Sequence, residues 1–148
     1  MIKYVKGDLL NAEQNVIVHQ CNAQDTMGSG VAKAIRAKYP QVYNDYVKYF
    51  QDIPKPSRMG MVLAVQVGTE RSVTVCNLIG QLHYLPRGIR HTSYDALTKG
   101  FEEIKRHTKE DLAMPKIGCG LGGGDWKIVS AIIESVFDDR DVYIYELE

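Results

Sequence analysis

The sequence is short of cysteines and of long apolar runs. Its three cysteines, Cys21, Cys76 and Cys119, form no C-x-x-C pair. This excludes a disulfide framework, and His19-x-Cys21 alone offers too few ligands for zinc, so we expect no metal and no cofactor. No apolar run is long enough for a membrane span or a signal-peptide core. We therefore expect a cytoplasmic protein that does not contact membranes.

An excess of charge of one sign is also lacking, because Lys+Arg and Asp+Glu are balanced at 18 each. A protein that binds nucleic acid through its overall field carries net positive charge, and this chain has none. The hydrophobic content of 45% is sufficient for a core, and 148 residues are the usual size of one domain. We predict a single domain over residues 1–148 and expect a monomer.

Runs rich in β-branched and aromatic residues predict six strands. They cover residues 2–6, 15–20, 60–66, 72–77, 111–115 and 141–147. Segments with helical periodicity lie between them, at about 30–39, 41–50, 93–107 and 126–137, the last beginning after Asp125 as N-cap. Strands that alternate with helices predict an α/β fold, with a largely buried sheet covered on both faces.

Two glycine-rich loops stand where ligands of such sheets bind, after a strand and before a helix. The first glycine loop (residues 22–30) carries Gly28 and Gly30, and the second (residues 115–125) has five glycines between 118 and 124. Each loop precedes a helix N-terminus, which attracts anions. Tight turns that need positive φ are the alternative. We expect no packing reason for so many glycines, so two facing anion sites indicate a diphosphate.

Two common diphosphate motifs do not fit. After Gly118 and Gly123, Gly124-Asp125 stands where a P-loop has Lys-Ser/Thr. Gly28-Ser-Gly30 is followed by Val-Ala-Lys33, so the third glycine of the Rossmann motif is absent. ATP hydrolysis of the P-loop type and Rossmann-type dinucleotide binding are therefore disfavoured.

Four motifs, taken in order along nearly the whole chain, resemble the macrodomain family. They are Val5-Lys-Gly-Asp-Leu-Leu10, Met27-Gly-Ser-Gly-Val-Ala32, Pro115-Lys-Ile-Gly-Cys-Gly-Leu-Gly-Gly-Gly-Asp-Trp126 and Tyr143-Ile-Tyr145. The resemblance is greatest to the branch with ADP-ribose-1''-phosphate phosphatases and small macrodomains that remove ADP-ribose from acidic side chains or DNA. It implies a three-layer α/β/α fold with a central mixed six-stranded sheet.

The resemblance also implies a role for each matching residue. Asp8 would accept a hydrogen bond from the adenine amino group, Leu9 and Tyr145 would flank the purine, and Asn22 would bind the distal ribose. Capping of a turn is the alternative for Asp8, and a core position is the alternative for Tyr145. The distal ribose and the phosphates would be held by Gly28, Ser29, Gly30, Val31, Gly118, Cys119, Gly120, Leu121, Gly122 and Gly123.

The chain departs from part of this branch where some members carry a catalytic lysine, just after the fourth strand. Gln81 stands at that position, and an amide cannot act as an amine nucleophile. Hydrolysis would then depend on Asn22 and on an acid or base among Asp25, His19 and Asp125. A core position is an equal alternative for His19.

Three functions stay open. The first is a hydrolase acting at C1'' of an ADP-ribose derivative, which is ADP-ribose-1''-phosphate or an ADP-ribosylated protein or nucleic acid. The second is a reader that binds ADP-ribose without turnover. The third, unrelated nucleotide or nucleic-acid binding, is disfavoured by the zero net charge.

Overall fold

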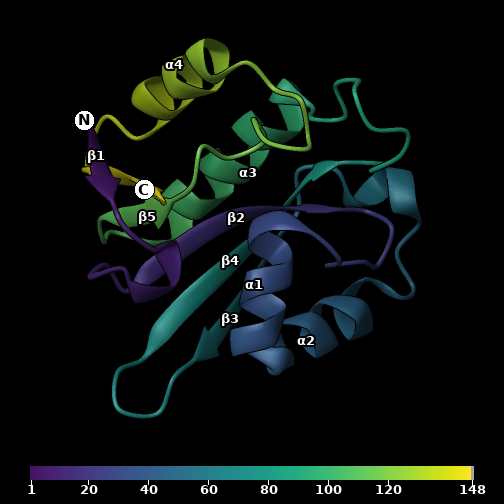
Figure 1. The fold of residues 1–148 in the computed structure, drawn as a ribbon, viewed down its shortest axis with the longest axis horizontal. Coiled ribbons are helices and arrows are strands. Elements are labelled where there is room, and N and C mark those ends of the chain that lie inside the picture. Colours follow the sequence, from purple (N-terminus) through teal and green to yellow (C-terminus); the bar gives the residue numbers. More distant parts are fainter. Residues whose placement is uncertain (148) are drawn as a thin grey trace.

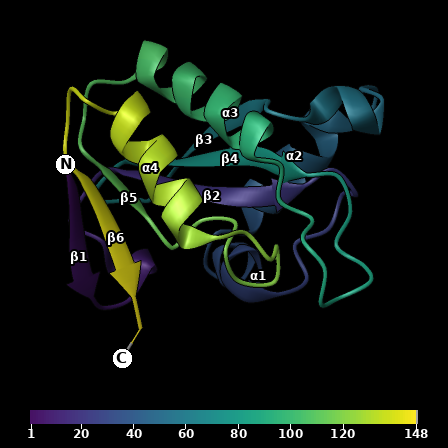
Figure 2. The same ribbon diagram turned by 90° about the horizontal axis from the view of Figure 1, so that it is seen from above.

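The computed structural model describes residues 1–147, in which six strands form one sheet between two layers of helices (Figures 1 and 2). The order across the sheet is β1-β6-β5-β2-β4-β3; β3 is antiparallel to β4 and the other pairs are parallel. The predicted mixed sheet and three-layer architecture are confirmed. The strands are β1 (Ile2–Lys6), β2 (Val16–Asn22), β3 (Val62–Val67), β4 (Val73–Gln81), β5 (Leu112–Met114) and β6 (Val142–Glu146).

Two helices cover each face of the sheet, as Figure 2 shows from above. On one face lie α1 (Gly30–Lys38) and α2 (Pro40–Phe50), and on the other lie α3 (Tyr94–His107) and α4 (Trp126–Val136). Short 3₁₀ turns, η1 (Leu9–Asn11) and η2 (Lys55–Arg58), follow β1 and α2. The η2 turn lies between the predicted helix at 41–50 and the predicted strand at 60–66. No helix within residues 1–147 combines the length and the apolar character needed to cross a membrane.

The core lies on both sides of the central strands β2 and β4. Alternate β2 residues point to opposite faces, so Ile17 packs under α1 and α2 while Val18 packs under α3 and α4. Gly100 lets α3 approach the sheet, because a side chain there would overlap Leu78 of β4. This close packing fixes the central strands, whose ends carry the candidate site.

Strands β2 and β4 run further than the sequence predicted, ending at Asn22 and Gln81 rather than at Gln20 and Asn77. The two strands pair with each other through these extensions, with Cys21 opposite Ile79. Because parallel strands end at one edge of the sheet, the connections after β1, β2, β4 and β5 meet there.

Candidate functional site

A cavity of about 730 Å³ opens among these connections, a volume within the range of small-molecule sites, about 300–1,000 Å³. Four parts of the chain line it: the end of β2, the start of α1 with the turn before it, the connection after β4, and the second glycine loop. The lining residues are 19–22, 26–32 and 115–122 with Gln81, Tyr84, Leu85 and Arg87.

The cavity brings together most of the residues predicted for the site. Those that line it are His19, Asn22, Gly28, Ser29, Gly30, Val31, Gly118, Cys119, Gly120, Leu121 and Gly122. Those that do not line it are Asp8, Leu9, Asp25, Gly123, Asp125 and Tyr145. The sequence analysis missed Tyr84, Leu85 and Arg87, although the connection after β4 had to reach the same edge of the sheet.

The residues predicted for adenine, Asp8, Leu9 and Tyr145, do not line this cavity. Leu9 belongs to the hydrophobic cluster against which Val31, which does line the cavity, and Tyr145 also pack. One carboxylate oxygen of Asp8 accepts the Leu10 N–H at 2.9 Å and caps η1. The Tyr145 hydroxyl donates to Gln14 Oε1 at 2.8 Å. The alternatives weighed for Asp8 and Tyr145, a turn cap and a packed tyrosine, are therefore both present.

The second glycine loop is packed against Thr92, which corrects the expectation that its glycines have no packing reason. A Cβ on Gly118, where φ is +75°, would stand 2.9 Å from the Thr92 methyl, and one on Gly122 would overlap the Thr92 hydroxyl. The same hydroxyl donates to the Gly118 carbonyl at 2.7 Å. The Gly122 carbonyl accepts from the backbone N–H groups of His91 and Thr92. These glycines are therefore required by the fold of the loop.

Two other glycines have no such reason. A Cβ on Gly28 or Gly120 would meet no atom within 4 Å, neither residue has positive φ, and both line the cavity. Glycine at such a position leaves room for something outside the chain to approach the backbone. The backbone at these two positions is therefore open to close approach by a molecule outside the chain.

The helix N-termini at the two loops differ. At α1, the N-cap Ser29 makes no side-chain capping bond, so the first N–H groups stay available beside the cavity. At α4, the carboxylate of Asp125 caps the helix by accepting the Lys127 N–H at 2.9 Å. The N-terminus of α4 thus carries its own carboxylate cap, and Asp125 does not line the cavity; its role as an acid or base stays a prediction.

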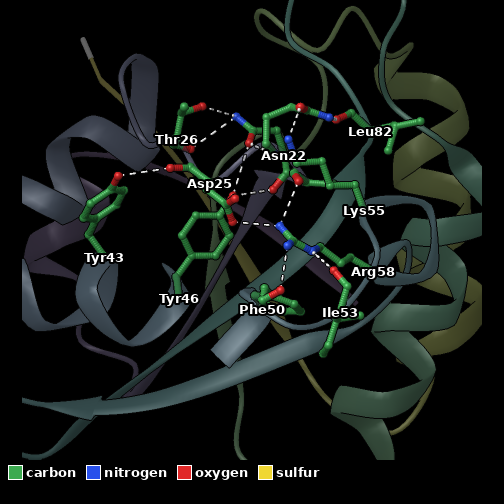
Figure 3. A network of polar contacts seen from close by, with 12 residues as sticks. Asn22, Asp25, Thr26, Tyr43, Tyr46, Phe50, Ile53, Lys55, Arg58 and Leu82 are labelled. Atoms are coloured by element: carbon green, nitrogen blue, oxygen red, sulfur yellow. Dashed lines mark hydrogen bonds and ion pairs between the residues drawn. The ribbon is translucent and has the colours of Figure 1, made fainter. Parts of the chain in front are cut away.

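Asn22 lines the cavity, but its amide is engaged within the first glycine loop (Figure 3). Its Nδ2 donates to the hydroxyl and the carbonyl of Thr26 at 2.8 and 3.2 Å. Its Oδ1 accepts from the Gln24 N–H at 2.8 Å and lies 3.2 Å from the Tyr46 hydroxyl. Since both Nδ2 hydrogens have partners, the amide shapes the first glycine loop in this geometry, and its contact with the distal ribose stays a prediction.

Asp25 does not line the cavity and forms an ion pair with Arg58, Oδ1 to Nη1 2.7 Å (Figure 3). It is the one residue other than glycine with positive φ, 63°, within residues 1–147. One carboxylate oxygen is therefore engaged by Arg58, and the role of Asp25 as an acid or base stays a prediction.

His19 is fully buried beneath the cavity. Its Nε2–H donates to Asn77 Oδ1 at 2.6 Å, which leaves Nδ1 without a partner. Burial lowers the pKa of His19 to about 4. The core alternative therefore describes this residue, and a catalytic role is not supported by its surroundings.

The buried histidine predicts acid sensitivity. Its pKa in the unfolded chain is near 6.5, so between about pH 6.5 and 4 the unfolded state binds the extra proton. The free energy of unfolding therefore falls as the pH drops through this window, by up to about 1.4 kcal/mol per pH unit. His19→Gln, which keeps a donor for Asn77, should flatten this slope in urea unfolding at pH 7, 5.5 and 4.5. An unchanged slope would contradict the prediction.

Gln81 lines the cavity at the end of β4. In the branch of macrodomains that this sequence resembles, the resemblance places a lysine of some members at this position. Its Oε1 accepts from Gln20 Nε2 at 2.6 Å and its Nε2 donates to the His83 carbonyl at 2.7 Å. Gln20 Nε2 also donates to the Thr92 hydroxyl at 3.0 Å. One N–H and one lone pair of Gln81 remain, so this amide can still hydrogen-bond a ligand or a water molecule.

The cavity has few groups able to transfer a proton. Aspartate and glutamate are absent from the residues that line it within the described chain. Burial raises the pKa of Cys119 to about 11, so the thiol is protonated at neutral pH. The Lys116 ammonium lies 3.4 Å from Glu146 Oε2. The arrangement is therefore suited to binding and positioning more than to proton transfer by the protein.

Comparison with known proteins agrees with this geometry. A family model, Macro domain, matches residues 18–133. The ADP-ribose glycohydrolase OARD1 of Bos taurus is 32% identical over 151 residues, 97% of this chain and 88% of its own. The ADP-ribose 1''-phosphate phosphatase of Candida albicans is 23% identical, over 98% of this chain and 99% of its own.

Solved structures give the same result. The macrodomain of Mycobacterium tuberculosis DarG is 25% identical and superposes with a TM-score of 0.81, over 98% of this chain and 97% of its own. The match to the family model covers more than half of the chain, and the fold agrees over almost its full length. The chain belongs to the Macro domain family.

Proposed function

We propose that this protein binds ADP-ribose and hydrolyses a derivative of it at C1'' of the distal ribose. The observation that carries the proposal is the cavity in which the open backbone of Gly28 faces the same space as that of Gly120, beside the uncapped N-terminus of α1. Backbone N–H groups on both sides suit a diphosphate. The relatives named above act on ADP-ribose derivatives, which supports the same substrate class here.

We propose an orientation of the ligand from the order of the strands. The sheet runs from β1 and β6, beside Asp8 and Tyr145, through β5 and β2 to β4, beside Gln81. With adenine at the Asp8 end, the free oxygen of that carboxylate accepts from the adenine amino group. The diphosphate then lies between the glycine loops, and the distal ribose lies at the Gln81 end.

Hydrolysis at this site is a reaction of water positioned by the protein. Water adds an OH group to C1'' or, in a phosphate ester, to the phosphorus. The bond between that atom and the leaving group breaks, and the leaving group takes up the remaining proton of the water. Gln81 has one free N–H and one free lone pair for the water or the ribose. The rate depends mainly on how the substrate and the water are positioned, since a displacement of about 1 Å lowers the rate about a hundredfold. No covalent lysine intermediate forms.

The group attached to C1'' meets the connection after β4. Tyr84, Leu85 and Arg87 line that end of the cavity, and they are exposed. A guanidinium and an aromatic ring suit a carboxylate-rich peptide or a nucleic-acid strand. We propose an ADP-ribosylated protein or nucleic acid as the substrate of a monomeric cytoplasmic enzyme, whose three cysteines are free thiols.

The proposal is tested first by binding. ADP-ribose at about 100-fold above Kd should stabilise the protein by about 2.7 kcal/mol, or roughly 5–10 °C in Tm. AMP should give a much smaller shift, because it spans only the adenine end. Equal shifts with ADP-ribose and AMP would contradict the assignment of the glycine loops.

The hydrolytic step is tested on ADP-ribose-1''-phosphate and on an ADP-ribosylated peptide, by measuring phosphate or ADP-ribose released. Borohydride should trap no protein adduct. Binding without turnover on either substrate would favour the reader function, for which the supporting observation is that, within residues 1–147, neither aspartate nor glutamate lines the cavity.

A further inference from the structure

Arg58 is a buried cation that does not line the cavity. Its Nε donates to the Ile53 carbonyl at 2.8 Å, and its Nη2 donates to the Phe50 carbonyl at 2.6 Å. Its Nη1 donates to the Ala23 carbonyl at 2.9 Å and to Asp25 Oδ1 at 2.7 Å. The guanidinium therefore joins the end of α2 and η2 to residues 23–25 of the first glycine loop (Figure 3).

Two tyrosines of α2 hold the same segment from below (Figure 3). The Tyr46 hydroxyl donates to the Asn22 carbonyl at 2.6 Å, and the Tyr43 hydroxyl donates to the Asp25 carbonyl at 3.0 Å. Since Tyr46 is buried, its bond is protected from water. Every residue from 22 to 26 thus has a contact to Arg58, to a tyrosine of α2, or to the Asn22 amide.

Asp25 has a backbone that few side chains adopt. At φ 63° it lies in the left-handed region, which aspartate and asparagine tolerate better than most residues. Residue 26 already lines the cavity, and Gly28 and the N-terminus of α1 follow directly. The direction in which the chain leaves residue 25 therefore sets where these backbone groups lie.

We propose that Arg58 and Asp25 are positioning residues for the ligand site. They fix residues 22–26 so that the backbone from Met27 to Gly30 faces the cavity, and neither touches the ligand. The identity of the ligand, ADP-ribose, rests on the proposed function, whereas the placement of the backbone by Arg58 and Asp25 does not. Asp25 then contributes through its geometry, with no proton transfer.

The experiment compares Asp25→Asn, Asp25→Ala and Asp138→Ala. Asparagine keeps an acceptor for Arg58 and tolerates positive φ, while alanine does neither. Asp138 is the matched control, because its ion pair with Lys105 has the same length, 2.7 Å, but is exposed and distant from the cavity lining. Amide NMR shifts of residues 27–30 are measured without ligand. Calorimetry gives the Kd for ADP-ribose, and turnover is followed on ADP-ribose-1''-phosphate.

For Asp25→Ala we expect altered amide shifts at residues 27–30 and about tenfold weaker binding, the loss of roughly one charged hydrogen bond. Asp25→Asn and Asp138→Ala should keep the wild-type shifts and a Kd and turnover within about threefold. A folded Asp25→Ala protein with wild-type shifts and Kd would overturn the proposal. So would an Asp25→Asn protein that binds normally but has lost turnover, because that result assigns Asp25 to proton transfer.

Failure of the proposed function has a different signature. If the wild-type protein does not bind ADP-ribose, that function is wrong, and the ligand-free amide shifts still decide whether Asp25 positions residues 27–30. Should Asp25→Ala not fold, Tyr43→Phe removes only the hydroxyl that contacts the Asp25 carbonyl. It is expected to shift the same amides, and unchanged amides would overturn the proposal.

Discussion

Replacing Gly120 by valine is expected to weaken ADP-ribose binding by about 100-fold or more while leaving stability nearly unchanged. Gly120 is exposed, and a Cβ on it meets no protein atom within 4 Å. The added side chain therefore enters the cavity and takes space that the ligand needs. Calorimetric titration with ADP-ribose and urea unfolding of the same samples measure the two effects separately.

A neighbouring glycine supplies the control. Gly122→Ala places its methyl against the hydroxyl of Thr92, so it should lower the free energy of unfolding by about 1–3 kcal/mol. Gly28→Ala, on the other loop, should behave like Gly120→Ala, with weaker binding and normal stability. If Gly120→Val binds ADP-ribose as wild type does, the ligand does not lie against the second glycine loop.

The architecture could be predicted from the sequence because its signals are local. Apolar periodicity predicted α3 and α4, and Asp125, the expected N-cap of α4, lies directly before that helix. Ser93, predicted as the first residue of α3, is its N-cap. The end of β4 was predicted too early, because Asn77 and Gly80 interrupt its apolar run. Gly80 is not a turn: a side chain there would overlap Gln20 of the neighbouring strand. The need for glycine at position 80 arises from Gln20, in another part of the chain, so no local sequence pattern reveals it.

The candidate site was predictable in position but not in detail. Glycine content indicated both loops, yet it could not separate Gly120, which is open to the cavity, from Gly122, which packs on Thr92. Polar residues in the first loop looked like ligand contacts. Asn22 and Asp25 instead bond to partners within the protein, some of them more than twenty residues away. Partners so distant in sequence are set by tertiary packing.

Arg58 is the clearest case of a residue whose importance the sequence conceals, and its replacement is expected to destabilise the protein strongly. Its side chain is only 4% exposed, although it stands in a proline-containing segment that looks like a surface loop. Arg58→Met keeps most of the apolar stem and removes every donor. The carbonyls of Ala23, Phe50 and Ile53 and the Asp25 carboxylate then lose the guanidinium as a hydrogen-bond donor.

A buried polar group left without its partner costs about 1–3 kcal/mol, so the loss of the guanidinium should lower the free energy of unfolding by about 3 kcal/mol and Tm by roughly 10 °C. The Asp25 carboxylate is 35% exposed, so it contributes less than a fully buried ion pair would. The stability of Arg58→Lys should lie between those of the wild type and Arg58→Met. An ammonium keeps the charge, but it cannot reach four acceptors as a planar guanidinium does. Arg106→Met is the control, since Arg106 is 61% exposed and pairs only with Glu103 on its own helix; it should change stability little. Urea unfolding at pH 7 measures all three variants. Equal, small losses for Arg58→Met and Arg106→Met would mean that the contacts of the buried guanidinium add little to stability, so the first glycine loop would have to be held by Tyr43 and Tyr46 alone.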